Sequence, residues 1–130
     1  MSDKRHILII DDDPLTARLF GAKLAESGFE VLYAHDADEG REMARRFSPD
    51  LILLDIRMEP TDGYKIAARL KEEKKTAGIP IIFLTNEDLT PEAEKDMKEL
   101  WAEDYMHKSV ELNEFVRRVR AVVERRAPDK

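Results

Sequence analysis

Short, unbroken runs of large apolar residues recur along the chain and set its pattern. The clearest runs cover Ile7–Ile10, Leu51–Leu54 and Ile81–Leu84. A continuous apolar run of this length predicts a strand that is buried on both faces of a sheet. Two weaker segments, Val31–Ala34 and Asp104–Lys108, complete a set of five predicted strands.

Between these runs, apolar residues recur at helical spacing, which predicts five helices. Asp13-Pro14, Asp36 and Thr90-Pro91 mark helix starts, because short oxygen-bearing side chains suit the N-cap and proline suits the first turn. The apolar stripes of the five helices, in chain order, are Leu15, Leu19, Ala22, Phe20 and Leu24; Gly40, Met43, Ala44 and Phe47; Ile66, Ala67 and Leu70; Ala93, Met97, Leu100 and Trp101; and Leu112, Phe115, Val116, Val119, Val122 and Val123.

Strand and helix alternate five times, which predicts an α/β fold with a parallel five-stranded sheet between two helical layers. The common spatial order for such a sheet is 2-1-3-4-5, the flavodoxin-like arrangement. A chain of 130 residues is expected to form one domain. We place this domain at residues 4–124 and interpret residues 125–130 as a polar tail.

Composition narrows the function classes. The absence of cysteine excludes disulfides, thiolate metal sites and thiol nucleophiles, and the net charge of -6 argues against nonspecific nucleic-acid binding. No apolar run approaches the ~20 residues of a membrane span. The polar start, Met1 to His6, is unlike a signal peptide, so we expect a soluble cytoplasmic protein.

The predicted strand order brings acidic residues together. Ligands bind outside the carboxyl ends of strands in open parallel sheets, where Asp11, Asp12 and Asp55 would meet with Thr85 and Lys108 beside them. Neighbouring carboxylates repel one another unless a cation joins them, and a set of oxygen ligands suits Mg²⁺. An Asp can also act as a nucleophile toward phosphorus, so the pattern favours phosphoryl chemistry.

With these residues in view, the chain resembles the receiver domains of two-component response regulators. The resemblance rests on the acidic pair Asp11-Asp12, on Asp55 and Asp62-Gly63, and on Thr85 and Lys108, which follow one another in the family's order. It implies that Asp55 accepts a phosphoryl group from a histidine kinase or a phosphotransfer protein. The protein would then be a phosphoacceptor with at most slow self-dephosphorylation rather than an enzyme.

The resemblance also implies roles for single residues. Asp12, Asp55 and the backbone carbonyl of Arg57 would ligate Mg²⁺ directly, and Asp11 would do so through a bound water. Thr85 and Lys108 would sense the phosphoryl group, and Tyr105 matches the family's aromatic switch. The fourth helix, fifth strand and fifth helix would form the surface that contacts a downstream protein or an output domain, without direct nucleic-acid binding.

Two departures from the family keep a second interpretation open. Ser109 replaces the proline that usually follows the lysine, and Asn86 replaces a small residue after the threonine. A receiver fold that serves as a phosphorylation-independent interaction module therefore remains an alternative. A haloacid-dehalogenase-like phosphatase is disfavoured because the chain is too short for a cap, and a flavin site because aspartates occupy its phosphate loop.

Several other polar residues receive simpler interpretations. Asp13 is best explained as a helix cap, and Arg57 is expected to pair with Glu87 across the mouth of the site and hinder water. The scattered histidines, which receive no role, are His6, His35 and His107. A basic cluster on the last helix forms a solvated face, meets an acidic partner or pairs across a homodimer; it contains Arg117, Arg118, Arg120, Arg125 and Arg126.

Overall fold

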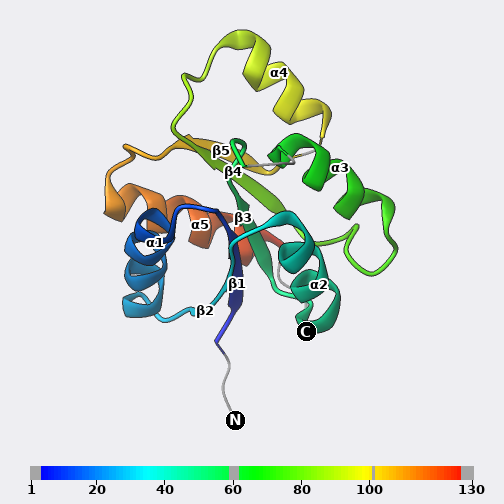
Figure 1. Ribbon diagram of the computed structural model, residues 1–130. Coiled ribbons are helices and arrows are strands. Elements are labelled where there is room, and N and C mark those ends of the chain that lie inside the picture. Colours follow the sequence, from blue (N-terminus) through cyan, green and yellow to red (C-terminus); the bar gives the residue numbers. More distant parts are fainter. Residues whose placement is uncertain (1–3, 59–61, 101, 127–130) are drawn as a thin grey trace.

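The computed structural model describes residues 4–58, 62–100 and 102–126, and it alternates strands with helices throughout (Figure 1). Trp101, most of the tail and part of the loop after Asp55 therefore lie outside the described residues. The elements are β1 (His6–Ile10), α1 (Pro14–Glu26), β2 (Glu30–Ala34), α2 (Ala37–Phe47), β3 (Leu51–Leu54), α3 (Gly63–Glu72), β4 (Ile81–Thr85), α4 (Pro91–Glu99), β5 (Asp104–His107) and α5 (Leu112–Arg126).

The five strands form one parallel sheet in the order β2-β1-β3-β4-β5. The predicted fold class and strand order are thus confirmed. β1 and β3 lie side by side with Ile10 opposite Leu54, so Asp11 and Asp55 leave adjacent strands at the same level. The switch in winding direction between these two strands is where folds of this kind place their ligands.

Alternate residues of each central strand enter different cores. Ile7 and Ile9 of β1 face the core beneath α1 and α5, whereas Leu8 and Ile10 face the core beneath α2, α3 and α4. This period of two follows from the pleat of a strand. Figure 1 shows the same division, with α1 and α5 on one side of the sheet and the other three helices on the opposite side.

The helix starts follow the predicted capping chemistry. The side chain of Asp13 accepts a hydrogen bond from the N–H of Leu15, and Asp36 accepts one from Glu39. Thr90 caps α4 in the same way. Each of these oxygens satisfies a backbone donor that the first turn of a helix leaves without an intrahelical partner.

Two of the predicted apolar stripes need correction. In α1, Phe20 and Leu24 are buried as predicted, but Leu15 and Leu19 are 77% and 54% exposed, because the helix turns Ala17 and Gly21 toward the core in their place. Phe47 ends α2 and is 50% exposed. Among the other stripes, the face of α3 and the valines of α5 are buried as predicted.

Two basic residues of the last helix contact other segments of the chain. Arg118 pairs with Asp104 of β5, with Nε donating to Oδ2 at 2.9 Å. Arg120 donates to the carbonyl oxygen of Ser27 at the end of α1, at 3.0 Å. α5 continues to Arg126, two residues into the segment interpreted as tail. In the described parts of the chain, every helix is too short or too polar to span a bilayer.

Candidate functional site

The carboxyl ends of β1 and β3 place two aspartates side by side. The backbone N–H of Asp55 donates to the carbonyl of Ile10, and that of Asp11 donates to the carbonyl of Ala34. The residues that precede them, Ile7–Ile10 of β1 and Leu51–Leu54 of β3, are buried, so the last backbone bonds of both strands hold the two aspartates in place. Asp11 and Asp55 are only 4% and 6% exposed, which is unusual for carboxylates.

Asp12 joins these two residues in an acidic cluster. One carboxylate oxygen from each of Asp11, Asp12 and Asp55 lies within 4.8 Å of the others, and Asp12 alone of the three is exposed. Lys108 faces the cluster from the end of β5. Its Nζ lies 2.8 Å from Asp11 Oδ2 and 3.3 Å from Asp55 Oδ2. One ammonium group therefore balances two buried carboxylates, and the cluster remains net negative.

The electrostatics of the cluster follow from burial and from mutual repulsion. Burial and then the charge of Asp11 raise the pKa of Asp55 to about 6, against the opposing effects of Lys108 and the Arg57 backbone N–H. Burial alone would lower the pKa of Lys108. The hydrogen bond and charge of Asp11, together with Asp55, outweigh that effect and raise it. The lysine therefore stays charged, while Asp55 holds the proton more strongly than an ordinary carboxyl.

Thr85 and Lys108 are held at neighbouring strand ends. Thr85 is fully buried, and its hydroxyl oxygen accepts a hydrogen bond from the N–H of Glu87 at 3.0 Å. The N–H of Lys108 donates to the carbonyl of Thr85 at 2.7 Å. A hydroxyl that accepts one bond can still donate its proton to another acceptor. The two residues are thus linked through the backbone at adjacent strand ends.

Tyr105 lies two residues before His107 on β5 and points toward α4. Its hydroxyl donates to Glu94 Oε1 at 3.2 Å. Partial burial, and then the charge of Glu94, raises the pKa of Tyr105, so the phenol remains a donor at neutral pH. The ring therefore ties the fifth strand to the fourth helix through one hydrogen bond.

Arg57 and Glu87 meet at the rim of the site. Arg57 Nη1 lies 3.1 Å from Glu87 Oε2, which confirms the predicted pair, and the two side chains are 72% and 41% exposed. Both residues line the open pocket above Asp55, together with Asn86, Lys108, Asp12 and Asp13. The backbone N–H of Arg57 also donates to Asp55 Oδ1 at 3.2 Å.

A glycine supports the acidic cluster from below. The N–H of Gly63, at the first position of α3, donates to the carbonyl of Ile56 at 2.7 Å. A Cβ atom at this position would lie 2.2 Å from the carbonyl oxygen of Asp55 and 2.8 Å from the Cα of Ile56. Only glycine allows α3 to begin this close to the strand end that carries Asp55.

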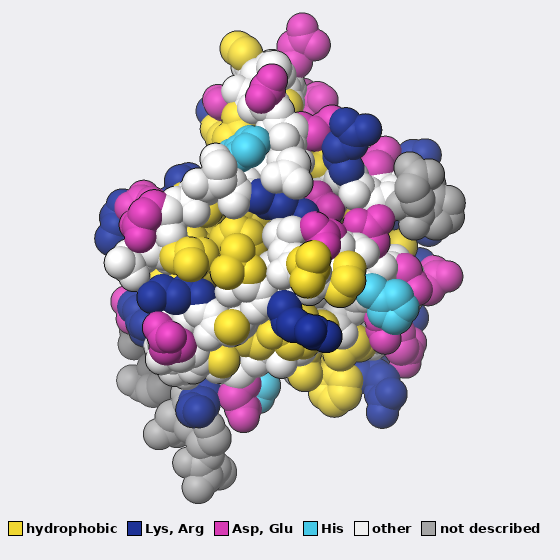
Figure 2. All heavy atoms as spheres, turned by 60° about the vertical axis from the view of Figure 1, so that its left-hand side comes forward, with side chains coloured by type: hydrophobic (Ala, Val, Ile, Leu, Met, Phe, Trp, Pro, Cys, Tyr) yellow, Lys and Arg dark blue, Asp and Glu magenta, His cyan; other side chains and the backbone are white. Residues whose placement is uncertain are grey.

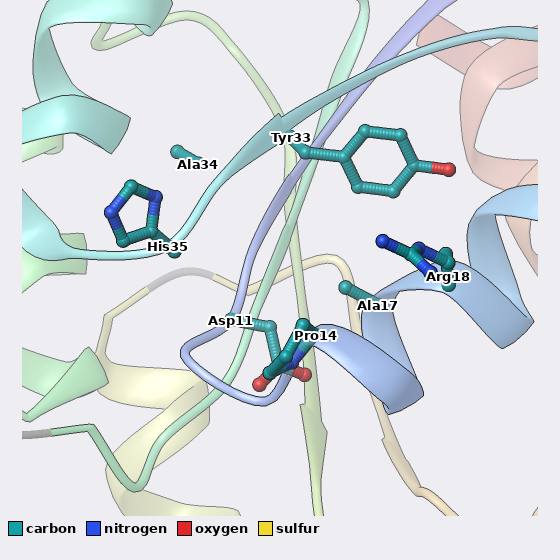
Figure 3. A pocket seen from close by; sticks show the side chains of 7 residues that line it. All are labelled: Asp11, Pro14, Ala17, Arg18, Tyr33, Ala34 and His35. Carbon is teal, nitrogen blue, oxygen red and sulfur yellow. The ribbon is translucent and has the colours of Figure 1, made fainter.

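A second pocket lies on the other side of Asp11, between α1 and β2 (Figure 3). The first turns of α1 supply its Pro14, Ala17 and Arg18 walls, and Tyr33 lies across from them on β2. Tyr33 also packs over α1, where a Cβ on Gly21 would lie 1.9 Å from its hydroxyl oxygen. The small residues of α1 therefore let β2 side chains approach the helix closely.

The face formed by α1 and α5 carries exposed apolar side chains. Figure 2, which brings this side forward, shows hydrophobic groups gathered among charged ones beside an acidic cluster. Leu15, Leu19 and Tyr33 are exposed large hydrophobic residues on this side.

The structure thus brings together the predicted residues Asp11, Asp12, Asp55 and Lys108, with Thr85 at the next strand end. Sequence reasoning missed the contact of Glu94 with Tyr105, because no local pattern links a helix residue to a strand eleven residues later. It also missed His107, whose ring contacts lie in two separate loops. For the close packing of Gly63 against the backbone of Asp55, the sequence offers one indication, which is the position of the Asp62-Gly63 pair shortly after the strand that ends at Asp55.

Comparison with known proteins gives a consistent picture. The family model described as "Response regulator receiver domain" matches residues 7–120. The chain is 35% identical to the DNA-binding dual master transcriptional regulator RpaA of Synechocystis sp., covering 92% of this chain and 49% of that protein. It is 33% identical to Protein PilH of Pseudomonas aeruginosa, covering 90% of this chain and 96% of that protein.

Among solved structures, a putative response regulator from Chloroflexus aurantiacus superimposes with a TM-score of 0.87 at 29% identity, covering 94% of this chain and 99% of that one. The chain spans about half the length of the first curated relatives it matches, including RpaA at 49% and the phosphate regulon regulator PhoB of Pseudomonas aeruginosa at 53%.

Proposed function

The chain belongs to the response regulator receiver domain family, and on this premise we propose that it accepts a phosphoryl group on Asp55. One observation carries the proposal. Asp55 is a buried carboxylate at a strand end, with an ammonium group at 3.3 Å and two further carboxylates grouped beside it. A nucleophile, a positive group for the phosphoryl oxygens and a set of metal-ligating oxygens therefore share one pocket.

The donor set fits a Mg²⁺ ion. All three grouped ligands are carboxylate oxygens, and the raised pKa of Asp55 reflects a negative, buried cluster that a hard cation would relieve. We infer that Asp12, Asp55 and the backbone carbonyl of Arg57 hold the ion directly, and that Asp11 does so through water. Bound Mg²⁺ would supply positive charge for the oxygens of the incoming phosphoryl group.

The chemistry of Asp55 is a displacement at phosphorus. A deprotonated Asp55 oxygen attacks the phosphorus of a phosphohistidine, the new O–P bond forms, and the P–N bond breaks with its electron pair remaining on the imidazole nitrogen. Lys108 stabilises negative charge on the phosphoryl oxygens. Water attack at the same phosphorus would later release inorganic phosphate and restore the carboxylate. We expect this hydrolysis to be slow, because the Arg57–Glu87 pair at the rim of the pocket hinders the approach of water to Asp55.

The proposed partners follow from the same site. A histidine kinase or a phosphotransfer protein would supply the phosphoryl group. Thr85 and Tyr105 would relay its presence to the face formed by α4, β5 and α5, which would contact a downstream protein or an output domain. RpaA and PhoB are named as transcriptional regulators, and this chain matches about half of each. The net charge of -6 argues against nonspecific contact with nucleic acid, so we propose regulation through that face.

The proposal is tested by intact mass after incubation with Mg²⁺ and acetyl phosphate. Wild type should gain one phosphoryl group, and Asp55→Asn should gain none. Asp38→Asn is a matched control, because Asp38 is an exposed residue in the first turn of α2 and should leave uptake unchanged. A wild-type protein that accepts no phosphoryl group, from acetyl phosphate or from a histidine kinase, would favour the phosphorylation-independent interaction module.

A further inference from the structure

His107 links the two loops that follow β4 and β5. Its Nε2 lies 3.1 Å from the carbonyl oxygen of Asn86, and its Nδ1 lies 2.8 Å from Ser109 Oγ. The backbone N–H of Ser109 also donates to Nδ1 at 3.0 Å. Asn86 follows Thr85 directly and Ser109 follows Lys108 directly, so the imidazole joins the chain segments beyond both strand ends.

These contacts determine which nitrogen of the ring carries the proton. A backbone N–H can only donate, so Nδ1 must present its lone pair to Ser109. Nε2 then carries the proton and donates it to the carbonyl of Asn86. The contacts are therefore those of one neutral tautomer, in which the ring accepts from one loop and donates to the other.

Strand geometry explains why this residue can reach both loops. Thr85 and His107 are opposite each other in the parallel ladder, and the N–H of Lys108 continues that ladder to Thr85 at 2.7 Å. Met106 enters the core beneath α1 and α5, so His107 shares the other face of β5 with Tyr105. A side chain on that face stands beside the start of the loop between β4 and α4.

The bond to Ser109 also accounts for a departure from the family pattern. A proline after the lysine would have no N–H and would restrict the backbone by its ring. Ser109 retains an N–H that can donate and has no such restriction. His107 supplies the acceptor, and the N–H of Val110 closes the turn by donating to the carbonyl of His107 at 3.0 Å.

We propose that neutral His107 is a positioning residue, which holds the loops after β4 and β5 together and so places Thr85 and Lys108 for phosphoryl chemistry at Asp55. This inference rests on the proposed function. In this chain, the hydrogen bond between His107 and Ser109 would restrict the backbone after Lys108, as a proline at position 109 would otherwise do. His107 acts through its two neighbours and has no contact with the reacting atoms.

Three substitutions separate the two hydrogen bonds. His107→Leu removes both. His107→Asn places an amide oxygen near the position of Nδ1 and can accept from Ser109, whereas His107→Gln extends an amide nitrogen toward Asn86 and can donate there. The matched control is His6→Asn. His6 is exposed and begins β1, so it lies at the amino ends of the strands, whereas the site lies at their carboxyl ends.

The readout is the rate of phosphoryl uptake from acetyl phosphate with saturating Mg²⁺, measured well below each variant's unfolding temperature. We expect His107→Leu to slow uptake about tenfold, with partial recovery in both the Asn and Gln variants and no change in His6→Asn. Uptake at the wild-type rate in His107→Leu would overturn the inference. Equal slowing in all three variants would also overturn it, since the hydrogen bond kept in the Asn or Gln variant would then contribute nothing to the rate.

A second measurement needs no variant. Two-bond proton–nitrogen NMR correlations of the wild-type imidazoles, recorded above the pKa range of histidine, distinguish the two neutral tautomers. A proton on Nε2 of His107 is expected, and a proton on Nδ1 would contradict the bond from Ser109. Absence of phosphoryl uptake by wild type itself would instead contradict the proposed function, so the two failures are distinguishable.

Discussion

The surroundings of one side chain, Asp55, set its protonation state. Its pKa is raised from an ordinary 3.8 to about 6, first by burial and then by the charge of Asp11. The folded protein therefore binds a proton at Asp55 more tightly than the unfolded chain does. Stability from this group is fully present below about pH 3.8 and is lost as the pH rises through about 6.

We predict from this sign that Asp55→Asn, which carries no charge, is more stable than wild type at pH 7 without Mg²⁺. The expected gain is on the order of 2 kcal/mol, and it should vanish near pH 4 because wild-type Asp55 is then protonated. Urea unfolding of both proteins at several pH values, in the presence of a chelator, gives the difference. A variant less stable than wild type at pH 7 would contradict the raised pKa.

Some residues of the site could be predicted from the sequence, and others could not. Asp11, Asp55 and Lys108 could be predicted together, because each directly follows an apolar run and the strand order fixes where the runs end. The contacts of His107 and Glu94 could not be predicted. They depend on the rotamer of one side chain and on a carbonyl or carboxylate from a distant segment, and neither leaves a local pattern.

At the element scale, the loops after β3 and β4 are joined at the rim by Arg57 and Glu87. The pair is exposed, so its effect on stability should be small, no more than about 1 kcal/mol. We predict that Arg57→Ala speeds loss of the phosphoryl group by up to about fivefold, since water would reach Asp55 more easily. The rate of loss after removal of the donor measures this effect.

A double substitution supplies the control for the rim pair. Glu87→Gln should speed the loss as Arg57→Ala does, and the combined variant should be no faster than either alone, because only one interaction exists to be removed. Additive effects would mean that the two residues act separately. An unchanged rate in Arg57→Ala would remove the pair from the mechanism.

The first residue of α3, Gly63, packs closely against the end of β3. Gly63→Ala introduces a Cβ that would lie 2.2 Å from the backbone oxygen of Asp55, so the helix or the strand end must shift. We expect a loss of about 1–3 kcal/mol in unfolding free energy and slower phosphoryl uptake. Gly78→Ala is the matched control, since its Cβ would meet nothing within 4 Å. Equal effects of the two substitutions would contradict the close packing at Asp55.

The helices also show where hydrophobic periodicity misleads. The start of α1 was predictable from Asp13-Pro14, yet the large Leu15 and Leu19 proved exposed. The buried stripe contains Ala17 and Gly21, which let α1 approach the sheet and Tyr33 closely. A prediction that counts only large apolar residues misses buried faces made of small ones. Small residues bury little area, but they allow a helix to pack closely against its neighbours.

In the molecule as a whole, the sheet separates two hydrophobic cores, and the site lies at the carboxyl ends of the central strands, where the sheet meets solvent. Thr85 and Lys108 lie at strand ends, and Tyr105 connects β5 to α4. Arg118 in turn connects α5 to β5 through Asp104. A change at Asp55 therefore has a continuous set of contacts by which to reach the α4–β5–α5 face.

We predict that beryllium fluoride, a phosphoryl mimic, shifts backbone amide signals along α4, β5 and the start of α5 as well as around Asp55. The signals of α2, which shares no such contacts with Thr85 or Lys108, should move little. Two-dimensional NMR of the labelled protein with Mg²⁺ measures both sets. Shifts confined to the immediate surroundings of Asp55 would contradict a switch at the α4–β5–α5 face.

Chemical trapping identifies the side chain that carries the phosphoryl group. Borohydride reduces an aspartyl phosphate to homoserine, which peptide mass mapping locates in the sequence. After treatment with Mg²⁺ and acetyl phosphate, we predict homoserine at position 55 in wild type and at no other aspartate. Homoserine at Asp11 or Asp12, with Asp55 unmodified, would contradict the assignment of the nucleophile.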